Sequence, residues 1–164
     1  MKPFKRKISI FKSLGELKSI CTEDDFRVND GFGQVYVVEY GKNVKIGLST
    51  RLWTRLHTLE SNVRIYSGEQ LGMIAFCEPI PDFKLLEKHL HLRFFNNRLS
   101  AYGELFNVSF LNAVDALQHE TAEPFPIETL EYNHKRKTNA NKHKWGENKQ
   151  LRNYLKNLYK DGEA

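Results

Sequence analysis

Two short apolar runs separated by a glycine-containing turn constrain the fold of this chain more than any other feature. Residues 35–40 and 44–48 are rich in β-branched and aromatic side chains, and Gly-Lys-Asn at 41–43 lies between them. Runs of this kind joined by a Gly/Asn turn predict a β-hairpin. The chain is therefore expected to place these two strands side by side in an antiparallel sheet, with the other elements arranged around them.

The spacing of apolar residues predicts one more strand and five helices. A third strand is expected in the apolar run at 71–77. The expected helices lie near 9–21, from Ser49 or Thr50 through the leucines at 52, 56 and 59, from Asp82 to about Leu99, from Ser109 onward, and near 146–160. The predicted fold class is α/β (α+β), with a small, mainly antiparallel three-stranded sheet flanked by helices.

Three segments are expected along the chain. Residues 1–30 should form an N-terminal helical extension, 31–122 a compact core domain, and 123–164 a basic linker and C-terminal helix that follow two prolines. No apolar run is long enough for a membrane-spanning helix or a signal peptide, so no membrane partner is expected. Cys21 and Cys77 lack the spacing of a disulfide framework or a zinc site, which fits a reducing cytoplasm.

Positive charge is concentrated in the C-terminal segment. Residues 133–160 hold nine Lys and Arg against a single acid, Glu147, whereas the whole chain has a formal net charge of +5. A basic block of this kind typically contacts nucleic-acid phosphates or an acidic partner, although a solvated tail has the same composition. The tail cations expected to bind substrate are Lys135, Arg136, Lys137, Lys142 and Lys144.

Short motifs in the hairpin and the following helix point to a family. The first strand begins Gln-Val-Tyr and places Tyr36 within it, the second contains Lys-Ile-Gly at 45–47, and Arg55 follows Gly47 by eight residues. This order resembles the core of the GIY-YIG nuclease superfamily. Lys45 stands where the superfamily usually has the tyrosine of its second motif, and this departure resembles a branch frequent in phage and prophage proteins.

A later motif extends the resemblance. Glu87 and His91 are four residues apart, Arg98 follows, and Gly-Glu-Leu-Phe at 103–106 places Glu104 after them. In the superfamily one glutamate coordinates a single divalent cation, so the resemblance implies that Glu104 binds Mg²⁺ (or Mn²⁺). A lone carboxylate completed by water suits Mg²⁺, which prefers oxygen ligands and retains much of its hydration.

The resemblance implies a metal-dependent DNA endonuclease and assigns the central roles. Tyr36 would activate water together with Lys45, which could lower the pKa of the tyrosine or hold a phosphate. Arg55 would bind a non-bridging oxygen as negative charge develops on the phosphorus centre.

The remaining candidate residues have supporting roles. The absence of a side chain at Gly47 would let the substrate approach the backbone closely. Arg51 and Arg98 are expected to bind phosphate, and His91 to act as a general acid/base or a phosphate contact.

Each of these residues also has a purely structural explanation, such as a packed strand tyrosine or an exposed helix cation. Two alternatives to cleavage therefore stay open: a catalytically inactive protein of the same fold that binds DNA, and a module that inhibits a host protein. Cutting both DNA strands would favour a homodimer, for which no interface is evident. The expected location is the cytoplasm of a bacterial host, with a phage as the source of the gene. The sequence does not decide between DNA and RNA.

Overall fold

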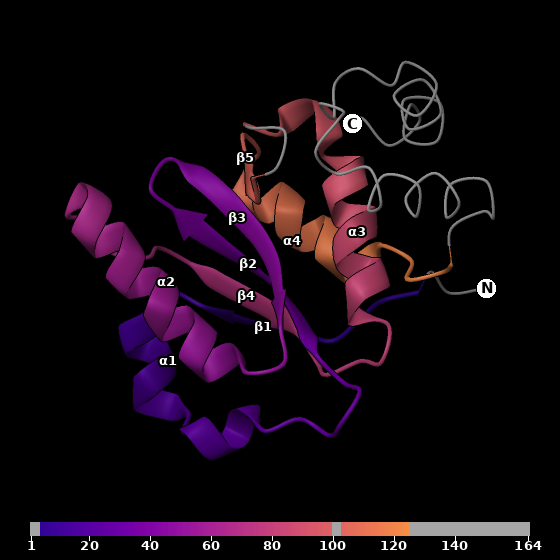
Figure 1. Ribbon diagram of the computed structural model, residues 1–164, viewed down its shortest axis with the longest axis horizontal. Coiled ribbons are helices and arrows are strands. Elements are labelled where there is room, and N and C mark those ends of the chain that lie inside the picture. The colour runs from indigo at the N-terminus through magenta and orange to yellow at the C-terminus, as the bar shows by residue number, and fades with distance from the viewer. Residues whose placement is uncertain (1–3, 100–102, 125–164) are drawn as a thin grey trace, which may run out of the picture.

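The computed structural model describes residues 4–99 and 103–124, which form a five-stranded sheet with helices on both faces (Figure 1). The strand order across the sheet is β1-β4-β2-β3-β5, and every neighbouring pair is antiparallel. The strands are β1 (Ile8–Phe11), β2 (Gln34–Tyr40), β3 (Asn43–Ser49), β4 (Ile74–Cys77) and β5 (Leu105–Phe106). The α/β (α+β) class is confirmed, but the sheet has five strands where three were predicted.

The hairpin of β2 and β3 is confirmed. Tyr40 pairs with Asn43 at the turn, where Gly41 has a φ of 63°. Glycine adopts this left-handed conformation without steric cost. The residues Val35–Val38 are fully buried because helices cover both faces of β2. This burial explains why the strand is a continuous apolar run and not an alternating one.

Helices form the two outer layers. They are α1 (Leu14–Ile20), α2 (Leu52–Ser67), α3 (Phe83–Arg93) and α4 (Phe110–His119), with short 3₁₀ helices η1 (Glu23–Phe26) and η2 (Phe95–Asn97). The α1, η1 and α2 helices pack on the face that carries Tyr36, and α3 and α4 pack on the opposite face with Val35 and Val37 (Figure 1). Successive strand residues point to opposite faces, so β2 contributes to both cores.

The N-terminal segment is not purely helical as predicted. Residues 8–11 form β1, in which Ile8 lies opposite Cys77 of β4. Helix α1 begins only at Leu14. Its N-cap is Ser13, whose hydroxyl accepts a hydrogen bond from the Glu16 backbone N–H at 3.1 Å. A short apolar run fits either a strand or a helix. Residues 8–11 become a strand because the edge of β4 offers them backbone hydrogen-bond partners. The spacing of residues in the sequence does not reveal this pairing.

Two helix boundaries also differ from the prediction. Helix α2 has Arg51 as its N-cap, whereas the Ser49 hydroxyl accepts a hydrogen bond from the Arg51 backbone N–H at 2.9 Å. Helix α3 starts after Asp82 as expected, but it ends at Arg93, and η2 follows. The helix opened by Ser109 is confirmed.

The described residues hold no helix that is long and apolar enough to span a bilayer. Both cysteines are free thiols, as their spacing predicted. The predicted tail cations and the helix expected near 146–160 lie outside the described residues.

Candidate functional site

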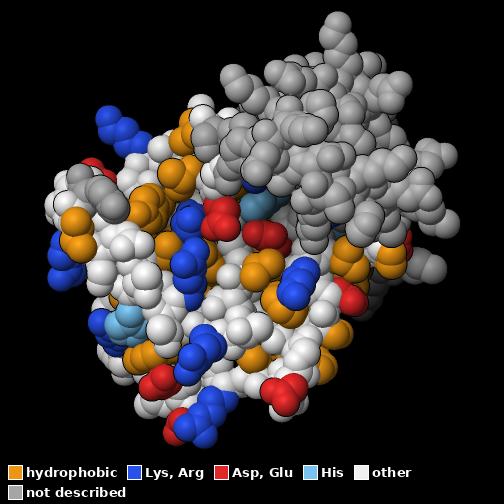
Figure 2. Space-filling model, viewed as in Figure 1, with side chains coloured by type: hydrophobic (Ala, Val, Ile, Leu, Met, Phe, Trp, Pro, Cys, Tyr) orange, Lys and Arg blue, Asp and Glu red, His pale blue; other side chains and the backbone are white. Residues whose placement is uncertain are grey.

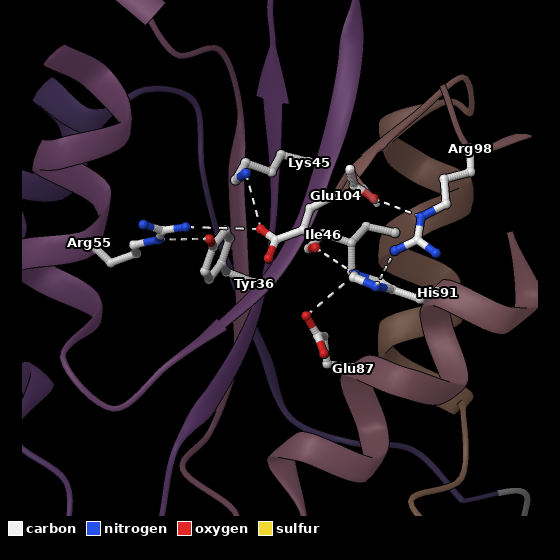
Figure 3. A network of polar contacts seen from close by, with 9 residues as sticks. Tyr36, Lys45, Ile46, Arg55, Glu87, His91, Arg98 and Glu104 are labelled. Carbon is white, nitrogen blue, oxygen red and sulfur yellow. Dashed lines mark hydrogen bonds and ion pairs between the residues drawn. The ribbon is translucent and has the colours of Figure 1, made fainter. Parts of the chain in front are cut away.

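The candidate site lies across strand β3, between α2 on one side and α3 on the other (Figure 3). Tyr36 on β2 and Gly47 on β3 are directly opposite each other in the strand register. The fully buried Tyr36 ring occupies the space above Gly47, because a Cβ at position 47 would lie 2.6 Å from the ring carbon Cζ. The same Cβ would lie 3.2 Å from Oε2 of Glu104. Glycine at position 47 therefore lets Tyr36 and Glu104 converge.

Arg55 connects α2 to Tyr36. Its backbone N–H donates to the Arg51 carbonyl at 3.0 Å, which places Arg55 in the first turn of the helix. Its guanidinium Nε donates to the Tyr36 hydroxyl at 3.1 Å. Burial raises the pKa of Tyr36, and the hydrogen bond from Arg55 opposes that rise. Tyr36 is thus neutral at pH 7, and its hydroxyl accepts from Arg55 while keeping its own proton.

Glu104 reaches the site from the edge of the sheet. The Ile46 backbone N–H donates to the Glu104 carbonyl at 3.0 Å, and the next residue, Leu105, pairs with Lys45. The Glu104 carboxylate oxygen Oε2 lies 3.0 Å from Nζ of Lys45 and 3.9 Å from Nη2 of Arg55. Within the described residues this enclosed oxygen has no hydrogen-bond partner of good geometry. Two cations therefore attract the same carboxylate oxygen, and a metal ion at this atom would have to displace Lys45.

Lys45 has a different partner from the one expected. Its side chain is 17% exposed and its ammonium forms the ion pair with Glu104. The cation that opposes the raised pKa of Tyr36 is Arg55. Lowering of the tyrosine pKa by Lys45 is thus not supported, and contact of Lys45 with a phosphate stays a prediction.

A second carboxylate faces the site from α3. Glu87 lies one helical turn before His91, and its Oε1 is 3.5 Å from Nε2 of that histidine. Burial and, next, the negative charge of Glu104 raise the pKa of Glu87 to about 7. Near neutral pH, Glu87 is consequently poised between its neutral and its charged form.

His91 links α3 to β3. Its Nε2 is 2.8 Å from the Ile46 carbonyl oxygen, so this nitrogen carries the proton and donates. Its Nδ1 lies 3.4 Å from Nη2 of Arg98. Burial lowers the pKa of His91, which keeps the ring neutral. Because both ring nitrogens have partners, the geometry favours a positioning role, and general acid/base action by His91 stays a prediction.

Arg98 supports the segment that carries Glu104. Its Nε donates to the Gly103 carbonyl at 2.7 Å, and its guanidinium carbon lies 5.8 Å from the centre of the Phe106 ring. These contacts hold the residue before Glu104 in place (Figure 3). The predicted contact of Arg98 with phosphate stays a prediction.

The carboxylates of Glu104 and Glu87 are the groups suited to a divalent cation. No cluster of three or more His, Cys, Asp or Glu that could hold a metal lies within residues 4–99 and 103–124. Two carboxylates are fewer than the three or four protein ligands of a typical zinc site. They fit Mg²⁺, which is commonly bound by one or two carboxylates and retains several waters. The carboxylate of Glu104, whose Oε2 lies 3.0 Å from Nζ of Lys45, is the group that would take such an ion.

Two features of this site have no clear signal in the sequence. The spacing of Glu87 and His91 indicated one helix face, but not that Glu87 would feel the charge of Glu104 from a different element. The pairing of Lys45 with Glu104 depends on strand β5, whose two residues carry no pattern of their own. Arg51 is exposed at the N-cap of α2, one turn before Arg55, and its predicted contact with phosphate stays a prediction.

Comparison with known proteins gives one family. The model of the T5orf172 domain matches residues 33–123, which is just over half of the chain and includes every residue of the polar network described above. This domain is phage-associated and belongs to an endonuclease-related group. No curated protein and no solved structure matches the chain.

Proposed function

The chain belongs to the T5orf172 domain family, and we propose on that basis that it is a metal-dependent endonuclease of the GIY-YIG type that hydrolyses phosphodiester bonds in DNA. The observation that supports this proposal most is the convergence of Tyr36, Arg55, Lys45 and Glu104 over β3. Hydrolysis of a phosphodiester requires a positioned water and fixed positive charge beside the phosphate. The four side chains come from separate parts of the sequence and offer both.

In the proposed reaction a water oxygen attacks the phosphorus, the bond from phosphorus to the leaving sugar oxygen breaks, and one proton of the water ends on that leaving oxygen. The Tyr36 hydroxyl would orient this water. Arg55 would bind a non-bridging phosphate oxygen, because Tyr36 and Glu104 already hold its guanidinium from two sides. Lys45 would add a second positive charge beside the same phosphate.

Glu104 would hold the Mg²⁺ (or Mn²⁺) ion through its carboxylate, with the ion replacing Lys45 as the partner of Oε2. When bound, such an ion stabilises the negative charge that develops on the phosphate and on the leaving oxygen. Glu87, whose carboxylate faces the same space, would complement the charge of the ion.

Cleavage of supercoiled plasmid in Mg²⁺, Mn²⁺ and EDTA tests the proposal, with single-stranded DNA and structured RNA as competing substrates. The wild type should cut DNA only when a metal is present. Glu104→Gln keeps the shape of the side chain but removes its charge, and it should lower the cleavage rate about 10²–10³-fold.

The matched control is Arg64→Gln on the same helix as Arg55. Arg64 is 62% exposed and pairs only with Glu60 in the described structure, at 3.1 Å, so its loss should leave the cleavage rate within about twofold. Equal rates for wild type and Glu104→Gln would refute the proposed role of this carboxylate.

A second candidate function has one observation in its favour. Lys45 lies 3.0 Å from the very oxygen of Glu104 that a metal ion would need, and an ion pair there competes with metal binding. A DNA-binding protein without cleavage would retain this pair. Salt-sensitive DNA binding without cleavage in any metal would favour that function. Absence of both activities would favour a host protein as the partner. Homodimer formation and the bacterial location also stay predictions.

A further inference from the structure

A pocket of about 360 Å³ lies beside the candidate site, where η1 and the chain after it meet the start of α2. Its walls include the rings of Phe26 and Trp53 and the side chains of Arg27, Arg51 and Thr54. The volume is at the lower end of the range for small-molecule sites, roughly 300–1,000 Å³. Residues 23–28 contribute one wall, and they precede the part of the chain that the family model matches.

The pocket continues the surface that carries the site. Arg51 lines the pocket, and Arg55, one helical turn further along α2, contacts Tyr36. One turn of helix advances about 5.4 Å, so consecutive nucleotides of one extended nucleic-acid strand could contact Arg51 and Arg55. Figure 2 shows a row of Lys and Arg side chains running down this face from the acidic side chains near its centre.

The lining combines an apolar platform with cations. The rings of Trp53 and Phe26 are 5.6 Å apart, and Trp53 is only partly buried, so part of its surface is open to a ligand. Arg27 pairs with Asp24 at 3.0 Å, but both side chains are more than 70% exposed. An exposed ion pair is worth at most about 1 kcal/mol, so it does not prevent Arg27 from binding a phosphate. Glu23 is the acid of the pocket wall and could accept a hydrogen bond from a base amino group.

We propose that this pocket binds one nucleotide of the substrate strand next to the scissile phosphodiester, with the base against Trp53 and its phosphate between Arg27 and Arg51. The inference rests on the proposed function for the identity of the strand. The proposal gives residues 23–28, which precede the family domain, a role in substrate binding. An aromatic surface flanked by cations is the arrangement that holds single-stranded nucleic acid without reading its sequence.

The test measures binding in EDTA, where no cleavage is expected, with the full chain carrying Trp145→Phe so that Trp53 is the only tryptophan. The probe is 5′-phosphorylated octathymidylate, and the readout is quenching of Trp53 fluorescence. The expected result is saturable quenching. An abasic octamer with the same phosphates should bind about tenfold more weakly and should not quench. Arg27→Gln should weaken binding severalfold and lower the slope of log affinity against log salt by about one.

The matched control is Lys18→Gln, an exposed cation of α1 that does not line the pocket. Its loss should leave both affinity and quenching unchanged. The proposal is overturned by absence of quenching, by equal binding of the abasic octamer, by equal quenching with an octaglutamate peptide, or by an Arg27→Gln variant that binds like wild type.

The outcome is independent of the cleavage assay. Quenching without cleavage in any metal would remove the proposed function but keep a nucleotide pocket. Cleavage without quenching would keep the function and remove the pocket.

Discussion

At position 47, a hydrogen atom in place of a side chain allows Tyr36 and Glu104 to approach each other. Both neighbours are held in place, since Tyr36 accepts a hydrogen bond from Arg55 and Glu104 is bonded through its backbone to Ile46. Tyr36 cannot withdraw without breaking its hydrogen bond with Arg55, and movement of the Glu104 carboxylate would disturb its ion pair with Lys45. Gly47 is therefore a requirement of the site's geometry.

Gly47→Ala should lower the DNA cleavage rate at least about 10²-fold and the free energy of unfolding by about 1–3 kcal/mol. The added Cβ would lie 2.6 Å from Cζ of Tyr36, so the ring must move. Single-turnover cleavage and urea unfolding measure the two effects. Gly15→Ala is the control, because its Cβ would meet nothing closer than 3.7 Å in helix α1. A Gly47→Ala protein with wild-type activity would contradict this role of the glycine.

Glu87 should make the stability of the fold depend on pH. Its folded-state pKa of about 7 lies above the ordinary value of 4.5, so between these values the folded state binds more protons than the unfolded state. The stabilising effect of the protonated form is complete below pH 4.5 and is lost as the pH rises through 7. Relative to Glu87→Gln, the wild type should lose up to about 3 kcal/mol between pH 4.5 and 8.

Urea unfolding of both proteins in EDTA at pH 4.5 and 8 measures this difference. Exposed Glu69→Gln serves as the control substitution. Parallel pH profiles for wild type and Glu87→Gln would show that Glu87 does not have the raised pKa.

At the scale of elements, the edge strands and the N-terminal segment support the central hairpin. Before β1 begins, Arg6 crosses to the end of α4, where its guanidinium donates to the carbonyls of Leu117 at 2.6 Å and Glu120 at 3.0 Å. Its backbone N–H donates to the Gln118 carbonyl at 2.7 Å. The last carbonyls of a helix lack partners within the helix, so a buried cation there stabilises both elements.

Arg6→Ala should lower the free energy of unfolding by about 2 kcal/mol, because two charge-assisted hydrogen bonds to carbonyls are lost. Urea unfolding measures the change, and Lys5→Ala, at the exposed neighbouring residue, is the control. Equal stabilities for the two variants would mean that Arg6 does not secure α4.

The elements that could be predicted from the sequence are those with strong local patterns. The central hairpin, the leucine stripe of α2 and the helix opened by Ser109 all have such patterns. β1 and β5 could not be predicted, because they are short and are strands only through pairing with β4 and β3. The same limit applies to the site. The order of Tyr36, Gly47, Arg55 and Glu104 predicted that they converge, whereas the partner of Lys45 and the environment of Glu87 depend on long-range pairing.

At the scale of the whole molecule, the proposed functional groups are distributed over more of the chain than the family domain covers. The polar network lies within residues 33–123, and one wall of the adjacent pocket comes from residues 23–28. The nine cations of residues 133–160 give the C-terminal segment its positive charge. We therefore propose that the centre carries out the chemistry, that the N-terminal segment positions the nucleic-acid strand and that the tail adds non-specific phosphate affinity.

The most direct test of the proposed nuclease site is the single-turnover rate of supercoiled plasmid cleavage in Mg²⁺ for wild type, Arg55→Ala, Glu104→Ala and the double variant. Nη2 of Arg55 lies 3.9 Å from Oε2 of Glu104. Because the two side chains belong to the same polar network, they should act as a unit on one phosphate. We predict a loss of about 10²–10³-fold in each single variant and little further loss in the double variant. A wild type that does not cut, or a double variant that cuts at the wild-type rate, would contradict this prediction.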